Sequence, residues 1–175
     1  TATEDQTLTA ANNLADEDGL GAISYQWNRA GAAVSGATNA TYTLTQADVG
    51  SAITVTASYT DQQGTAESVT SAATDAVANV NDTPTGTVTI SGTATEDQTL
   101  TASNDLADED GLGAISYQWN RGGAAVSGAT DATYTLTQAD VGSVITVKAS
   151  YTDAFNNAHS VTSSATAAVA NVNDA

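Results

Sequence analysis

Apolar and polar residues alternate along much of the chain, in short runs separated by clusters of Gly, Asn and Asp. The clearest run, ITVTASY, places Ile53, Val55, Ala57 and Tyr59 on one face and hydroxyl side chains on the other. A period of two is typical of a strand with one buried face. In the first half the pattern predicts strands at Gln6–Ala10, Ala22–Arg29, Ala32–Val34, Thr41–Thr45, Ala52–Thr60 and Glu67–Ala78, and a single turn at Thr45–Gly50. We therefore expect an all-β fold built of sandwiches.

The pattern repeats itself after 92 residues. Thr1–Thr83 align with Thr93–Ala175, and 69 of the 83 aligned pairs are identical. A repeat of this length is too long for a solenoid unit and about right for a domain that folds alone. The sequence therefore predicts two tandem domains of one type, residues 1–82 and 83–175.

One segment has no partner in this alignment. TGTVTISG (Thr85–Gly92) precedes the second copy, and its Val88 and Ile90 alternate with threonines as in a strand. Nothing equivalent precedes the first copy. We expect domain 1 to present an open sheet edge, at which strand exchange or homo-association can occur.

The differences between the copies concentrate at Gln62–Glu67, which align with Ala154–His159. A cluster of changes between unchanged flanks predicts a surface loop between two strands. Phe155 and His159 could give the second loop a contact with a glycan or a protein, which is the alternative function to a structural one. Simple drift of an exposed loop also explains the differences.

Each copy has one tryptophan in the middle of a predicted strand, Trp27 and Trp119 in YQWNR, with Tyr25 and Tyr117 on the same face. We expect each tryptophan to be the centre of a core. A platform for stacking carbohydrate is the alternative, but flanking turn residues place this strand inside a sheet.

Charge and composition exclude several functions. Twenty acidic against three basic residues give a net charge of −17, which disfavours nucleic acid and anionic membrane surfaces as partners. No apolar run is long enough for membrane insertion. There are no cysteines and one histidine, no phosphate-binding glycine loop, and no acid in an apolar setting that would raise its pKa. We therefore expect no enzyme.

The acidic residues gather in four places in each copy, and together with asparagines they supply the oxygen ligands that Ca²⁺ prefers. In the first copy these places are Glu4 and Asp5, then Asp16, Glu17 and Asp18, then Asp61, and last Asn79, Asn81 and Asp82; their counterparts are Glu96 and Asp97, Asp108, Glu109 and Asp110, Asp153, and Asn171, Asn173 and Asp174. A solvated surface with Asp and Asn in turns is the alternative. Turns do not require three adjacent acids, however, and adjacent carboxylates repel one another, so we predict calcium binding.

The run from GTATEDQTLTA through LADEDGLGAISYQWNR and ATYTLTQADVG to AVANVND resembles the Ig-like or cadherin-like tandem repeats of giant bacterial RTX-type adhesins. The tryptophan on a third strand likewise resembles an immunoglobulin-like fold without its disulfide. The resemblance covers essentially the whole chain. It implies two Ig-like β-sandwich domains, calcium, neighbouring repeats of the same chain as partners, and a place at the bacterial cell surface. The implied function is that of a spacer in an adhesin that supports adhesion or biofilm formation.

The linker NVNDTP is similar to the linkers of cadherin-like proteins, in which an ion clamps the joint. By this resemblance Asn79, Asn81 and Asp82 supply the linker ligands. Asp108 and Asp110, or Glu96 and Asp97, supply those of the next domain. The linker departs from the cadherin pattern at Asn79, where an acid is usual, and at Thr83.

Overall fold

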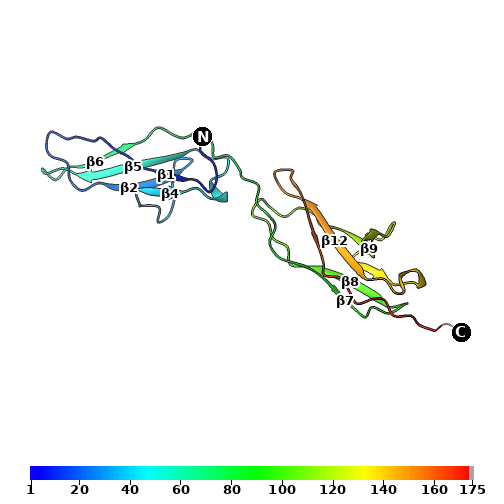
Figure 1. Cartoon of the computed structure of the whole chain (residues 1–175). Helices are drawn as coiled ribbons and strands as arrows, with labels where there is room; N and C mark the ends of the chain where they lie inside the picture. The colour runs from blue at the N-terminus through cyan, green and yellow to red at the C-terminus, as the bar shows by residue number, and fades with distance from the viewer. Residues whose placement is uncertain (174–175) are drawn as a thin grey trace. The chain divides into compact units, whose positions relative to one another are not determined.

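Strands and two short 3-10 turns make up the regular structure of residues 1–173, which are the residues that this computed structural model describes. The chain divides into two compact units, unit 1 from Thr1 to Val80 and unit 2 beginning at Asn81 (Figure 1). This division falls just before the predicted boundary between residues 82 and 83. All strand pairs within the sheets are antiparallel, and each unit is built of two sheets, so the predicted all-β sandwich class is confirmed. Among the described residues, no helix has the length and apolar character needed to cross a membrane.

Unit 2 contains a four-stranded sheet, in the order β10-β9-β12-β13, and a three-stranded sheet, in the order β11-β8-β7. Its elements are β7 (Val88–Ser91), β8 (Thr99–Asn104), β9 (Ser116–Arg121), β10 (Ala124–Ala125), β11 (Thr133–Thr135), the 3-10 turn η2 (Gln138–Asp140), β12 (Ile145–Thr152) and β13 (Ala158–Thr162). Strand β7 forms within the predicted segment Thr85–Gly92. In β12, Ile145, Val147, Ala149 and Tyr151 are buried, as the alternation predicts.

Unit 1 repeats this arrangement with one strand fewer. Its four-stranded sheet has the order β3-β2-β5-β6, and only β1 and β4 form the second sheet. The elements are β1 (Thr7–Thr9), β2 (Ser24–Arg29), β3 (Ala32–Ala33), β4 (Thr41–Thr43), the 3-10 turn η1 (Gln46–Asp48), β5 (Ile53–Thr60) and β6 (Ala66–Thr70). No counterpart of β7 is present among the described residues of unit 1, as the missing segment predicts.

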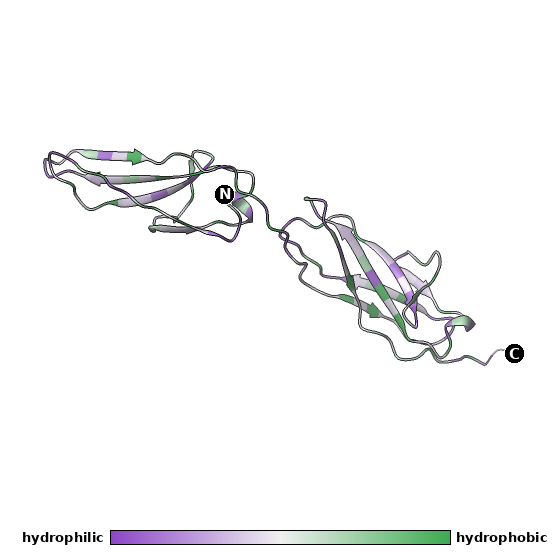
Figure 2. Cartoon of the chain, turned by 45° about the horizontal axis from the view of Figure 1, so that its top comes forward, coloured by the Kyte–Doolittle hydropathy of each residue, from purple (hydrophilic) through white to green (hydrophobic). Residues whose placement is uncertain are grey.

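The two tryptophans lie in the cores, as predicted. Trp119 is fully buried and its ring stacks on that of Tyr134, with 5.7 Å between the centroids. Its indole N–H donates to the carbonyl of Asp131 at 2.9 Å, so the buried polar atom is satisfied. Trp27 has the same surroundings in unit 1. Figure 2 shows hydrophobic and hydrophilic residues following one another along the strands around these cores.

An aspartate is buried at the corner where η2 leads into β12. The carboxylate of Asp140 is fully buried and accepts hydrogen bonds from Arg121 Nε at 2.7 Å and from the Tyr134 hydroxyl at 3.0 Å. The backbone N–H and the hydroxyl of Thr137 donate to it as well, at 2.8 and 2.9 Å. Asp48 of η1 has the equivalent partners in unit 1, which are Arg29 at 2.7 Å, Tyr42 and Thr45. These networks tie the connection between the sheets to the core.

Stability should fall in acid because of these two carboxylates. Burial raises the pKa of Asp140. Hydrogen bonds from the arginine, the threonine and the tyrosine lower it by more, so the pKa lies below its usual value. The pKa of Asp48 is lowered in the same way. A depressed pKa in the folded state adds stability above the unfolded value of about 3.9, and this stability is lost as the pH falls through the folded value.

The measurement is the free energy of unfolding in urea from pH 6 to pH 2. Protonation of the other acids also relieves repulsion, so the wild type is compared with Asp140→Ala at each pH. The difference between the two proteins should shrink below about pH 4. A difference independent of pH would contradict the prediction.

The observed strands of unit 1 are shorter than predicted, and the largest difference is at the end of β6. The prediction for Glu67–Ala78 continues to residue 78, but β6 ends at Thr70. Beyond it, side-chain hydroxyls take the place of ladder acceptors: the N–H of Val55 donates to Ser71 Oγ, and that of Ile53 donates to Thr74 Oγ1. Ser71 and Thr74 are three residues apart, whereas their partners Val55 and Ile53 are two apart, so the regular pairing of the two strands stops here.

Candidate cation sites

The loop LADEDGLG of each unit is closed by its own first aspartate. Asp108 Oδ1 accepts the N–H of Asp110 at 2.9 Å, and its Oδ2 accepts the hydroxyl of Tyr151 on β12. Burial and this hydrogen bond raise the pKa of the Tyr151 hydroxyl, which keeps it protonated and donating. In unit 1, Asp16 is held in the same way by Asp18 at 2.9 Å and by Tyr59 at 3.0 Å. The loop is thus fixed against the end of the long central strand.

A glycine makes this approach possible. A Cβ at Gly113 would lie 2.0 Å from the carbonyl oxygen of Thr152, the last residue of β12. Gly21 has the same relation to Thr60 in unit 1. Gly113 therefore lets the acidic loop lie next to Asp153, which directly follows β12.

Asp153 and His159 complete an acidic cluster with Asp108 in unit 2. Asp153 Oδ1 accepts the backbone N–H groups of Phe155 and Asn157, both at 2.8 Å. Burial raises the pKa of Asp153, but these hydrogen bonds and those of the Asn157 and His159 side chains lower it overall. His159 Nε2 lies 3.2 Å from Asp153 Oδ2 and 3.8 Å from Asp108 Oδ2. One ligand atom of each of the three residues lies within 4.8 Å of the others.

The same place in unit 1 contains three carboxylates, those of Asp16, Asp61 and Glu67. Asp61 Oδ1 accepts the N–H groups of Gln63 at 2.9 Å and Thr65 at 2.7 Å, so its loop is built like that of Asp153. Three carboxylates suit Ca²⁺, whereas an imidazole with two carboxylates suits transition metals better. The two units therefore differ in chemistry at a position where their folds agree.

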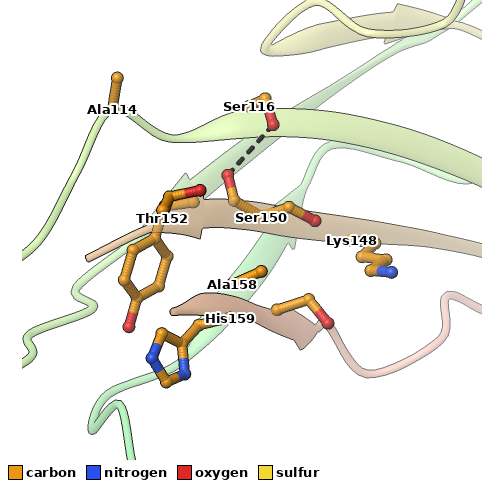
Figure 3. A pocket seen from close by; sticks show the side chains of 9 residues that line it. Ala114, Ser116, Lys148, Ser150, Thr152, Ala158 and His159 are labelled. Carbon is orange, nitrogen blue, oxygen red and sulfur yellow. Dashed lines mark hydrogen bonds between the residues drawn. The ribbon is translucent and has the colours of Figure 1, made fainter. Parts of the chain in front are cut away.

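A shallow hollow lies beside the His159 cluster, on the face of β9, β12 and β13. It measures about 520 Å³ and is lined mainly by alanine, serine and threonine. Lys148 and His159 also line it, and both are labelled in Figure 3. Figure 3 shows Lys148 and His159 at different places along it, and the Ser116 hydroxyl donating to the Ser150 carbonyl at 3.1 Å. Small hydroxyl side chains on a flat sheet offer little to hold a specific small molecule.

Asp110 lies where the chain enters unit 2. It is 2% exposed, and its Oδ2 accepts the backbone N–H of Asp82 at 2.8 Å. Its other oxygen, Oδ1, is buried and has no hydrogen-bond partner among the described residues. A hollow of about 370 Å³ beside it is lined by Asp82, Asp108 and Glu109 together with Thr83, Thr85 and Ala107. A buried carboxylate oxygen without a donor is rare, and an ion or an ordered water commonly accounts for one.

Glu4 and Glu96 lie where the chain leaves each unit. Both are nearly fully buried. Glu96 Oε2 accepts the N–H of Val172 at 3.1 Å, and Glu4 Oε2 accepts that of Val80 at 3.3 Å. Glu96 thus lies beside the C-terminal segment of unit 2 at Val172, while Asp110 lies beside its N-terminal segment at Asp82. Of the two alternatives for the second domain's ligands, Asp108 and Asp110 are the pair that lies with Asp82.

The remaining candidates are dispersed. Asp5 and Asp97 are exposed and have a positive φ of 63°, as in turns. Asp18 is exposed, unlike its counterpart Asp110. Asn79 is half-buried and its amide donates to the carbonyl of Val80, and Asn81 is exposed. Asp174 lies outside the described residues.

The prediction from the sequence missed Glu67 and His159. Both end the segments predicted to be a variable surface loop, and Glu67 was also predicted to be the first residue of a strand; β6 begins at Ala66 and β13 at Ala158, so both are strand residues. Each pairs with the tyrosine that holds the acidic loop, Glu67 with Tyr59 and His159 with Tyr151. The signal was available, because the two residues align with each other and both can bind metal. Since His159 faces the cluster, Phe155 is the exposed member of the proposed ligand-binding pair.

Neither of two comparisons with known proteins identifies the chain. No protein-family model matches it, and no curated protein matches it.

Proposed function

We propose that the chain is a pair of spacer repeats from a large bacterial cell-surface adhesin, stiffened by calcium at or near the linker. The near-identity of the copies supports a spacer, because length and stiffness need repetition whereas recognition needs one distinctive site. Such repeats act outside the cell, have neighbouring repeats of the same chain as partners, and catalyse no reaction. They support adhesion or biofilm formation by holding a binding tip away from the surface.

The order of the strands supports the immunoglobulin-like part of this proposal. In unit 2 the first, second and fifth strands share one sheet, and the third, sixth and seventh lie together in the other. This is the division of strands in an Ig-like sandwich, in which a buried tryptophan stands on the third strand, except that the short fourth strand β10 pairs with the third, whereas in a constant-type domain the fourth strand lies with the first, second and fifth. Trp119 on β9 has that place.

The observation that carries the calcium proposal is the unpartnered Asp110 Oδ1 beside Asp82. The aspartate side chain holds the linker residue with one oxygen and leaves the other, buried, without a donor. Asp110 would hold the ion together with Asp82 and Asp108, and these two line the neighbouring hollow with Glu109. Carboxylate and carbonyl oxygens are the ligands that Ca²⁺ takes.

A cation here would also offset part of the net charge of −17. Like charges around Asp82 oppose a fixed linker, and a divalent ion converts their repulsion into attraction. An ion that binds only the ordered arrangement stabilises it by mass action. The linker residues would then be fixed to unit 2, and the joint would stiffen.

Calcium should stabilise unit 2 through this site. Extracellular calcium modules bind with dissociation constants of about 0.1 to 1 mM, so 10 mM calcium should add between about 1.4 and about 2.7 kcal/mol to the free energy of unfolding. The measurement is urea unfolding with calcium or with EDTA, followed by the fluorescence of Trp119 in a Trp27→Phe background.

The matched pair of variants is Asp110→Asn and Asp18→Asn, which remove the same charge at equivalent positions, one buried and one exposed. Asp110→Asn should abolish the effect of calcium on unit 2, and Asp18→Asn should leave it unchanged. X-ray scattering of the wild type should also show larger dimensions in calcium than in EDTA. Identical scattering curves and equal unfolding free energies in the two buffers would refute the proposal.

A further inference from the structure

Two pairs of aspartates in this chain have fully buried carboxylates but differ in what compensates their charge. Asp48 and Asp140 each form an ion pair with an arginine. The side chains of Asp108 and Asp153 are 0% exposed as well, but among the described residues their only ion-pair partner is His159. Burying a carboxylate is costly unless an opposite charge compensates it. Two buried carboxylates beside a single imidazole therefore leave room for a further positive charge.

The side chains around His159 are held in place by their neighbours. In both Asp108 and Asp153, Oδ1 accepts backbone N–H groups of its own loop. Each Oδ2 accepts one side-chain hydrogen bond, from Tyr151 or from Asn157, which leaves a second lone pair. The His159 ring is 10% exposed and stacks on that of Tyr151, with 5.3 Å between the centroids. Hydrogen bonds and packing of this kind orient the ligands of metal sites.

The spacing of the three side chains fits one small ion. Zinc binds histidine nitrogen and carboxylate oxygen at about 2.0 to 2.2 Å, so ligand atoms around a tetrahedral zinc lie about 3.3 to 3.5 Å apart. His159 Nε2 lies 3.2 Å from Asp153 Oδ2 and 3.8 Å from Asp108 Oδ2, on either side of this range. One ligand atom of each residue lies within 4.8 Å of the other two. Small movements of the side chains would therefore complete the arrangement.

We propose that Asp108, Asp153 and His159 form a zinc site in unit 2. The ion would take Nε2 of the imidazole and one oxygen of each acid, compensate both buried carboxylates, and keep water as its fourth ligand. The hollow that His159 and Tyr151 help to line gives a hydrated ion a way in (Figure 3). This inference does not depend on the proposed calcium site, which is carried by the buried oxygen of Asp110.

Unit 1 provides the contrast within the same chain. The equivalent place has Asp16, Asp61 and Glu67, whose ligand atoms also lie within 4.8 Å of one another. Glu67 aligns with His159, which is the only histidine of the chain. Carboxylates alone suit hard cations such as Ca²⁺, whereas imidazole suits zinc. The exchange of one residue would therefore give equivalent places in the two units different metal preferences.

Calorimetric titration with zinc tests the site, in a buffer with excess magnesium to occupy weak acidic sites on the surface. The chain should bind one zinc ion. His159→Gln should weaken binding at least about a hundredfold, because loss of an outer hydrogen-bond partner alone costs between about 10-fold and 100-fold. Glu67→His is the reciprocal change in unit 1 and should give the chain a second zinc site. Asp110→Asn, which should abolish the effect of calcium, should leave zinc binding unchanged.

Nuclear magnetic resonance of the wild type gives a readout that needs no variant. Since the chain has a single histidine, its imidazole nitrogen signals are unambiguous. Zinc should shift the Nε2 resonance of His159 in step with the calorimetric binding curve. Zinc that leaves this resonance unmoved, or that binds His159→Gln as tightly as the wild type, would assign binding to the acidic surface and overturn the proposal. A chain that binds no zinc would also overturn it.

Discussion

The substitution Asp140→Ala should lower the free energy of unfolding of unit 2 by about 3 kcal/mol. The carboxylate is fully buried and is the common acceptor for Arg121, Tyr134 and Thr137. Alanine leaves the N–H of Thr137 and the hydroxyl of Tyr134 without this acceptor in a part-buried place, and it leaves a cavity. Arg121 is about one-third exposed and can turn towards water, which keeps the expected loss from being larger.

Urea unfolding measured by Trp119 fluorescence in a Trp27→Phe background tests this expectation. Trp119 stacks on Tyr134, so its emission reports on the same region. The control is Asp131→Ala, which removes an equal charge from an exposed side chain and should change the free energy by less than about 0.5 kcal/mol. Equal losses in the two variants would mean that the network adds nothing beyond a change in net charge.

The substitution Gly113→Ala should be comparably destabilising, by about 3 kcal/mol. The added methyl group would lie 2.0 Å from the Thr152 carbonyl oxygen, and Thr152 is paired with Ala158 of β13, so its backbone cannot move aside cheaply. Relief of the clash would push the acidic loop away from β12. We therefore expect the hydrogen bond between Tyr151 and Asp108 to be lost as well.

The matched control is Gly128→Ala. Gly128 has a positive φ of 76° but open space around its Cα, so alanine there meets conformational strain without a collision. It should cost about 1 kcal/mol. Urea unfolding followed by Trp119 fluorescence measures both variants. If Gly113→Ala lowers the free energy of unfolding no more than Gly128→Ala does, the loop moves aside at little cost.

The fold could be predicted from the sequence wherever a strand has one buried face. ITVTASY alternates cleanly, and β5 and β12 occupy the predicted positions. The alternation in Thr85–Gly92 also predicted a strand, and β7 lies within this segment. The end of β6 could not be predicted. The hydroxyls of Ser71 and Thr74 accept backbone N–H groups of the neighbouring strand β5, and this depends on a register that a single sequence does not reveal.

The candidate sites were harder to predict because distant residues decide them. Asp18 and Asp110 stand in the same motif, yet only Asp110 is buried and binds the N–H of a linker residue, Asp82. Nothing in DEDG distinguishes the two copies. His159 was assigned to a loop, because the cluster of differences around it includes the first residues of β13. Pairing with Tyr151 brings it to the acids, and that pairing follows from the sheet and not from local composition.

The use of arginine in the two corner networks has a consequence for resistance to digestion. Enzymes that cut after basic residues find three bonds in this chain, after Arg29, Arg121 and Lys148. All three residues lie in strands, and both arginines are also held by buried aspartates. We therefore expect cleavage to require local opening, which releases the arginines from their aspartates or β12 from its neighbours, and the lifetime of the intact chain in the presence of such an enzyme should report how often these places open.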